Sequence, residues 1–243
     1  MEVHNLFVTY EREKEINWSI RKDDLSIEPG GAISLKGPNM SGKTSIIQLL
    51  SGTLPVEAKA QGSLIHDDGR SFSFPMHTTK AKDLGIVSVH QDDTMFPDLS
   101  IFENIIIGYN YNYRGEIEGR LKGTYVEDIL NFLGVSGHQS LSNLSAGGTA
   151  LIRFARAVLS DHRLLIMDEP TSSLDDQYRD FLFSIISSTW SQESSYIFTS
   201  HNERDHEKFK RIARNNGSGY SVWELLFQAH ERGTVDIQCR DVL

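Results

Sequence analysis

Residues 37–45 read GPNMSGKTS, and this short stretch decides the fold. It fits the pattern G-x-x-x-x-G-K-[S/T] and lies between a predicted strand and a predicted helix, which is the context that this motif requires. Gly37 and Gly42 allow the backbone to curl, so that successive N–H groups face phosphate oxygens. Lys43 offers a positive charge to the β- and γ-phosphates, and the Thr44 hydroxyl suits Mg²⁺. The stretch predicts a phosphate-binding loop.

The alternative is a glycine turn that carries a lysine by chance, but the strand before the motif and the helix after it argue against this. Met40 occupies a position where a small residue is more usual. This affects the local shape of the loop and removes no ligand. The candidate phosphate-contacting residues are Gly37, Pro38, Asn39, Met40, Ser41, Gly42, Lys43, Thr44 and Ser45.

A second motif, RLLIMDEPTSSLD, covers residues 163–175. Its apolar residues predict a buried strand that ends in two carboxylates. Asp168 is a candidate to hold Mg²⁺ through water. Glu169 is a candidate to orient or deprotonate a water that attacks the γ-phosphate. A strand that merely ends in two acidic residues is the simpler interpretation of this motif alone, but the phosphate loop favours the catalytic one.

The rest of the chain has a mixed α/β pattern around these motifs. The segment 43–52 predicts a helix that stops at Gly52, and Asp68-Gly69 predicts the turn of a hairpin. Residues from about 92 to 160 are mostly helical in pattern. Strands are predicted in the segments 2–10, 24–37, 61–74, 84–91, 163–169 and 195–201. We expect one α/β nucleotide-binding core, approximately residues 1–91 and 161–243, with a helical insertion of approximately residues 92–160.

Composition excludes several classes of protein. A net charge of −9 over 243 residues argues against a protein that coats nucleic acid, and we expect no nucleic-acid partner. The single cysteine, Cys239, permits no intramolecular disulfide and fits a reducing compartment. No signal peptide and no apolar run of about 20 residues is visible. If the protein works at a membrane, another chain must supply the membrane spans.

Five motifs occur in a characteristic order: GPNMSGKTS, Gln91 in VSVHQDD, LSAGG at residues 144–148, LLIMDEPTSSLD, and His201 in FTSHNE. In this order and spacing, the chain resembles the ATPase domain of ABC transporters from about Glu2 to Glu203. The resemblance implies a P-loop NTPase core with an antiparallel β subdomain and an inserted helical subdomain. It also implies ATP and Mg²⁺ as ligands.

In that family two such domains pack head to tail and enclose two ATP molecules. The resemblance therefore implies that the phosphate loop of one subunit and the LSAGG stretch of the other contact the same γ-phosphate. Asp175 would touch the phosphate loop of the partner subunit. The contacts implied for the LSAGG stretch are Ser145, Ala146, Gly147 and Gly148. Taken alone, this stretch is an ordinary serine-capped helix start.

The resemblance implies further site residues. Gln91 would contact Mg²⁺ or the attacking water and serve as a hinge towards the membrane partner, although a glutamine at a strand end is an equally good interpretation by itself. His201 would reach the γ-phosphate. Tyr10 is the candidate for stacking on adenine, with nearby Trp18 as the other aromatic choice.

The sequence departs from the family pattern L-S-G-G-Q in the LSAGG stretch. Ala146 replaces the first glycine, Gly148 replaces the glutamine, and Leu151 occupies a position often held by arginine. The loss of the glutamine removes a polar group near the nucleotide. We therefore expect ATP-driven closure of the dimer to be weaker or slower than usual.

The predicted function is ATP hydrolysis that drives a membrane-embedded permease through closure of a homodimer or a heterodimer. The chain would then lie peripherally at the cytoplasmic face of the membrane. The segment 89–108 and the LLIMDEPTSSL run give a weak preference for an importer of sugar-like solutes. An exporter ATPase, a soluble ABC ATPase that works on ribosomes or DNA, and a module that binds ATP with little turnover remain as alternatives.

Overall fold

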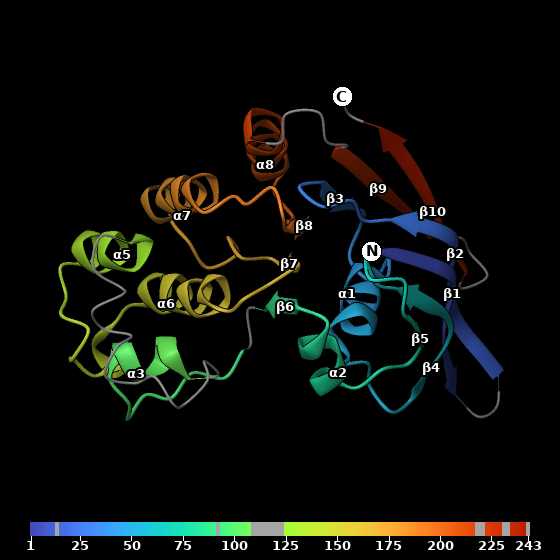
Figure 1. Cartoon of the computed structure of the whole chain (residues 1–243), viewed down its shortest axis with the longest axis horizontal. Helices are drawn as coiled ribbons and strands as arrows, with labels where there is room; N and C mark the ends of the chain where they lie inside the picture. The colour runs from blue at the N-terminus through green and yellow to red at the C-terminus, as the bar shows by residue number, and fades with distance from the viewer. Residues whose placement is uncertain (13–14, 91–92, 108–123, 217–221, 230–233, 242–243) are drawn as a thin grey trace.

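The computed structural model describes residues 1–12, 15–90, 93–107, 124–216, 222–229 and 234–241. Ten strands form one sheet in the order β5-β4-β1-β2-β10-β9-β3-β8-β7-β6, with helices on both of its faces (Figure 1). This arrangement agrees with the predicted fold class, an α/β core with an antiparallel β part and added helices.

Parallel strands make up one half of the sheet. The neighbours β9 and β3, β3 and β8, β8 and β7, and β7 and β6 all run in the same direction. Their carboxyl ends therefore lie at one edge, where ligands bind in open α/β sheets. The bounds are Val222–Ala229 for β9, Ala32–Lys36 for β3, Ser195–Thr199 for β8, Leu164–Met167 for β7 and Ile86–Val89 for β6.

The other half of the sheet is mostly antiparallel. β10 pairs antiparallel with β9 and parallel with β2, and so joins the two halves. The turn at Asp68-Gly69 links β4 to β5 as predicted, and Gly69 adopts φ of 82° there. The bounds are Glu2–Arg12 for β1, Glu15–Ser26 for β2, Ala58–Ile65 for β4, Ser71–Ser73 for β5 and Thr234–Asp241 for β10.

The helices of the described ranges divide between three places. α1 and α2 lie against one face of the sheet, α7 and α8 cover the other face, and α3, α5 and α6 gather at one end of the molecule (Figure 1). The bounds are Lys43–Ser51 for α1, Thr78–Asp83 for α2, Ile101–Ile106 for α3, Tyr125–Leu133 for α5, Ala146–Leu159 for α6, Asp176–Ser188 for α7 and Glu203–Asn216 for α8.

Strand β7 shows why the parallel half is so apolar. All four of its residues are buried, and they alternate between two hydrophobic clusters. Leu164 and Ile166 pack in the cluster that contains α1, whereas Leu165 and Met167 pack in the cluster that contains α6, α7 and α8. A strand covered on both faces needs a continuous apolar run rather than alternation. The run LLIM therefore predicts this strand correctly.

Glycine sets both ends of α1. Gly42 precedes the helix with φ of 96°, and Gly52 ends it with φ of 71°, both in the left-handed region. A Cβ on Gly52 would lie 2.6 Å from the carbonyl carbon of His77, so no side chain fits there. The predicted stop of this helix at Gly52 is confirmed.

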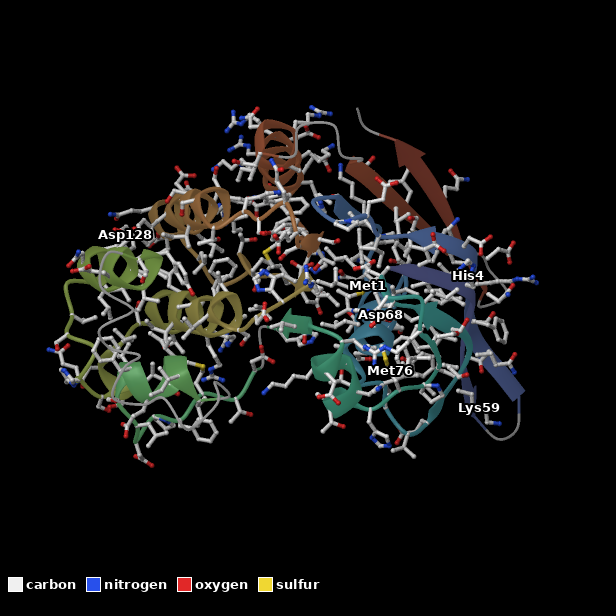
Figure 2. The ribbon with its side chains drawn as sticks, viewed as in Figure 1. Met1, His4, Lys59, Asp68, Met76 and Asp128 are labelled. Atoms are coloured by element: carbon white, nitrogen blue, oxygen red, sulfur yellow. The ribbon has the colours of Figure 1, made fainter. Side chains whose placement is uncertain are left out.

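Several elements differ from the expectations. β2 begins at Glu15, whereas the predicted strand begins at residue 24. The helices α2, α7 and α8 and the hairpin of β9 and β10 were not predicted. β6 is the last strand of the described sheet, and only Ile86 and Val89 of its residues are buried. Asp128 on α5 lies at one end of the molecule, and His4 on β1 and Lys59 on β4 lie at the other (Figure 2). Within the described residues, no helix is long and apolar enough to cross a membrane.

Candidate nucleotide-binding site

A cavity of about 960 Å³ opens at the carboxyl ends of the parallel strands. The loops that follow β3, β6, β7 and β8 all contribute to it, since these ends meet at one edge of the sheet. Its lining residues are Tyr10, Asn39, Met40, Ser41, Gly42, Lys43, Thr44, Ser45, Gln48, Thr53, His90, Asp168, Glu169 and His201. Most of the predicted nucleotide-binding residues thus share one cavity.

The phosphate loop is curled around its own lysine. Lys43 Nζ donates hydrogen bonds to the carbonyl oxygens of Gly37 at 2.8 Å and of Pro38 at 3.0 Å. A Cβ on Gly37 would lie 2.7 Å from Ser41 Oγ and 2.8 Å from Phe227 Cβ, so the tight approach requires glycine. The loop therefore surrounds the start of α1, where free N–H groups and the helix dipole attract an anion.

The lysine at this site is largely withdrawn from water. Burial lowers the pKa of Lys43, and the nearby charges of Glu169 and Asp168 oppose this effect. The Lys43 ammonium donates to two carbonyl oxygens. Hydrogen bonds to a charged phosphate would be stronger, because charge-assisted hydrogen bonds are the stronger kind. This geometry suits Lys43 to bind an anion such as a phosphate.

Asp168 and Thr44 offer the oxygen atoms that suit Mg²⁺. Asp168 follows β7 and accepts a hydrogen bond from Thr199 Oγ1 through Oδ1 at 2.8 Å. Its other oxygen, Oδ2, lies 3.4 Å from His90 Nδ1. Thr44 stands in the first turn of α1, exposed in the same cavity. A hydroxyl and a carboxylate fit this cation, which usually takes few protein ligands and keeps several waters.

Glu169 is held by its backbone as well as its side chain. Its φ of 51° is unusual for a residue with a Cβ. The backbone N–H donates to Thr199 Oγ1 at 2.9 Å, and Oε2 accepts from the His201 backbone N–H at 3.1 Å. His201 Nε2 lies 3.4 Å from Oε1. Burial raises the pKa of Glu169, and His201 partly opposes this rise. A raised pKa makes the carboxylate a better general base.

Other lining residues include predicted and unpredicted ones. The Tyr10 hydroxyl lies 3.0 Å from Ser45 Oγ, and Tyr10 lines the cavity. Gln48, Thr53 and His90 line the cavity as well, although no motif predicted them. The only sequence signal for His90 was its position directly before Gln91.

The LSAGG stretch and Asp175 lie elsewhere. Ser145 begins α6, and its Oγ accepts from the backbone N–H of Gly148 at 3.1 Å. Asp175 begins α7 and accepts from the Tyr178 N–H at 3.0 Å. Neither these two residues nor Ala146, Gly147 and Gly148 line the cavity. Gln91, the remaining predicted site residue, falls outside the described residues.

The fold and the sequence together identify the family. The sequence pattern of the family described as ABC transporter matches residues 20–172, which is more than half of the chain. The chain therefore belongs to the ABC transporter family.

Related proteins give further detail. The ribose import ATP-binding protein RbsA of Lactococcus lactis subsp. cremoris is 32% identical over 191 residues, covering 77% of this chain and 37% of the relative. RbsA of Bacillus cereus is 29% identical over 186 residues, covering 75% of this chain and 37% of the relative. The chain thus spans little more than a third of the length of these relatives.

Solved structures share the fold. The ATP-binding cassette MJ0796, in a dimeric post-hydrolysis state bound to ADP and Pi, superposes with a TM-score of 0.71 at 18% identity. The comparison covers 100% of this chain and 98% of the cassette. A second dimeric structure of MJ0796 gives a TM-score of 0.70.

Proposed function

We propose that this domain binds ATP with Mg²⁺, hydrolyses it, and uses the cycle to drive a transmembrane permease. The observation that carries the proposal is the shared cavity, in which a buried lysine, two carboxylates and a histidine from the strand ends face one another. Lys43 and the loop N–H groups bind the β- and γ-phosphates, while Tyr10 lies at the adenine end. Thr44 and Asp168, with Gln91, would hold Mg²⁺, which neutralises phosphate charge when bound.

Hydrolysis in this site depends mainly on positioning. Glu169 orients the attacking water and accepts its proton, because its carboxylate is fixed and its pKa is raised by burial. His201 presents its ring beside Glu169 and can contact the γ-phosphate. Such positioned charges act on the transferring phosphoryl group with little reorganisation.

The start of α6 in one subunit contacts the nucleotide that is bound by the other subunit. The start of α6 carries N–H groups that the helix itself leaves unpaired, yet its residues do not line the cavity of their own chain. Two copies, or this chain and a similar partner, would place Ser145 and Gly147 of one subunit on the γ-phosphate held by the other. Asp175 would contact the opposite phosphate loop. Reciprocal contacts are typical of a two-fold interface.

The preferred cargo is a sugar-like solute taken up by an importer, because the relatives RbsA are named as ribose import ATP-binding proteins. The domain would then act at the cytoplasmic face of the membrane as a peripheral subunit. An exporter ATPase is the second candidate, since the ATPase domain does not itself select the cargo.

The test begins with phosphate release by the purified chain, with Glu169→Gln as the inactive control. The chain is then purified from detergent-solubilised membranes, and any multi-span protein that accompanies it is reconstituted with it in lipid vesicles. We expect the permease and its solute to stimulate phosphate release by the wild type and not by the variant. Association with ribosomes or DNA instead would support a soluble ABC ATPase, and turnover that no partner stimulates would support a low-turnover module.

A further inference from the structure

Met40 is an unusual residue for a phosphate loop. Its side chain is 93% exposed, and in the described residues only Val56 is a more exposed large apolar side chain. Its backbone has φ of 60°, in the left-handed region that residues with a Cβ rarely occupy. Met40 also lines the candidate nucleotide cavity. Strain, exposure and location therefore coincide at one residue.

Neither the left-handed backbone nor the exposed side chain of Met40 stabilises the isolated chain. A glycine would adopt this φ at no steric cost, and an apolar side chain that stays in water gains no burial energy. Single exposed apolar residues are common, and Val56 is one of them. At Met40, however, the exposed side chain is held on strained backbone at a functional site, where such strain often serves the mechanism.

Small side chains lie at the surface near the starts of α6 and α7. A Cβ on Gly147 would lie 3.0 Å from the Tyr178 ring, so the two helix starts are in contact. The exposed residues at the starts of these helices include the small Ser145, Ala146, Ser172 and Ser173, beside the acidic Asp175 and Asp176. A long and flexible side chain can pack against a surface of small residues, and methionine adapts well to irregular shapes.

We propose that Met40 is an intersubunit contact residue whose side chain becomes buried against a second copy of this chain when ATP closes the dimer. The inference rests on the proposed pairing of the phosphate loop with the start of α6. Burial of Met40 adds apolar packing to the interface, and this packing offsets the absence of a polar side chain at Gly148. By two-fold symmetry the Met40 contact forms twice, so its effect on pairing is doubled.

Methionine oxidation tests this directly. The chain has five methionines, and Met1, Met76 and Met167 are buried. The Met95 sulfur accepts a hydrogen bond from Arg156 at 2.7 Å, so Met95 serves as an internal reference. Hydrogen peroxide is applied to the Glu169→Gln chain, and sulfoxide formation at each methionine is followed by mass spectrometry. The experiment is run without nucleotide, with ADP, and with ATP and Mg²⁺.

We expect ATP to slow the oxidation of Met40 by about tenfold, since exposure controls susceptibility. ADP should leave the rate close to that of the free protein. Adding Ser145→Arg to the same chain should restore fast oxidation with ATP present, because this variant binds nucleotide and cannot close. Equal protection by ADP, or by ATP in the Ser145→Arg chain, would show that the bound nucleotide itself covers Met40 and would overturn the inference.

Size-exclusion chromatography separates this inference from the function on which it rests. If ATP produces a dimer and Met40 remains fully oxidisable, the contact assignment is wrong and the proposed dimer stands. If the Glu169→Gln chain never dimerises with ATP, the proposed pairing fails and the inference fails with it.

Variants give an independent readout. Met40→Gly should weaken ATP-dependent dimerisation by about tenfold or more, because two side chains that are buried in each dimer are removed. Met40→Leu should keep most of the affinity, and Val56→Ser is the matched control for removal of an exposed apolar side chain outside the cavity. ATP affinity is measured on the Ser145→Arg background, which separates nucleotide binding from pairing. A Met40→Gly chain that dimerises as well as the wild type would contradict the proposal.

Discussion

Thr199 Oγ1 donates a hydrogen bond to Asp168 Oδ1 at 2.8 Å, and this contact ties the end of β8 to the end of β7. The same hydroxyl accepts from the backbone N–H of Glu169 at 2.9 Å. Thr199 is completely buried, so water cannot replace it. One hydroxyl thus fixes the candidate metal-binding carboxylate and the backbone of the candidate base.

Thr199→Val tests this link, since valine keeps the shape and removes the hydroxyl. We expect the free energy of unfolding to fall by about 1–3 kcal/mol, because two buried polar groups are left without their partner. The kcat for ATP should fall as well, while Thr199→Ser retains most of both. Urea unfolding and phosphate release measure the two effects. A valine variant with wild-type kcat would show that the hydroxyl does not position the carboxylates.

Glu169→Gln should abolish turnover and leave ATP bound. The amide cannot accept the proton of the attacking water, whereas the residues that hold the phosphates are unchanged. A closed, ATP-bound dimer should therefore accumulate, which size-exclusion chromatography detects. Hydrolysis close to the wild-type rate would contradict the assignment of Glu169 as the base.

Mixing two defective chains tests the trans arrangement. Ser145→Arg should bind nucleotide in its own loop but fail to close, whereas Lys43→Ala should not bind nucleotide in its own loop because the charge on the phosphates is gone. In a mixed dimer, one site carries both lesions and the other carries neither. We expect ATP-dependent dimerisation from the mixture and not from either variant alone.

Dimerisation is the readout for this mixture because turnover can require two working sites. Wild-type protein under the same conditions is the positive control. If no ratio of the two variants restores closure, Ser145 only caps α6, and the second phosphate reader is not supplied by the partner.

Acid should destabilise the fold through His206. This histidine belongs to α8 and is buried against β3: Nδ1 lies 2.6 Å from Ser34 Oγ, and Nε2 lies 2.8 Å from the Ser200 carbonyl oxygen. Burial lowers its pKa below the ordinary value of 6.5. As the pH falls below 6.5, this histidine is therefore protonated in the unfolded chain and stays neutral in the folded chain. The contribution of neutral His206 to the unfolding free energy is present above pH 6.5 and is lost as the pH falls below it.

His206→Gln should flatten the dependence of the unfolding free energy on pH between about 7.5 and 5.5. His4→Gln is a control for which we expect the opposite change in the pH dependence. A hydrogen bond to Asp24 raises the pKa of His4, so this surface histidine favours the folded state at low pH. Its removal should make the acid dependence slightly steeper. Denaturant titrations at several pH values measure both. An unchanged slope in His206→Gln would contradict the role of this histidine.

The sequence alone determined the local elements and the chemistry of their ends. GPNMSGKTS specified a loop before a helix, and Gly52 specified where the helix stops, because glycine and backbone geometry act over a few residues. The run LLIM followed by Asp168 and Glu169 specified a buried strand with carboxylates at its end. The resemblance then supplied roles for residues far from these motifs.

Only the tertiary structure decided which distant residues meet. Thr199 has no signal of its own in the sequence, yet it holds both Asp168 and Glu169, because β8 lies beside β7. The meeting of Tyr10 with Ser45 and of His90 with Asp168 likewise depends on the order of the strands. These contacts arise from pairing and packing between distant segments, whereas motifs and periodicity record only what neighbouring residues do.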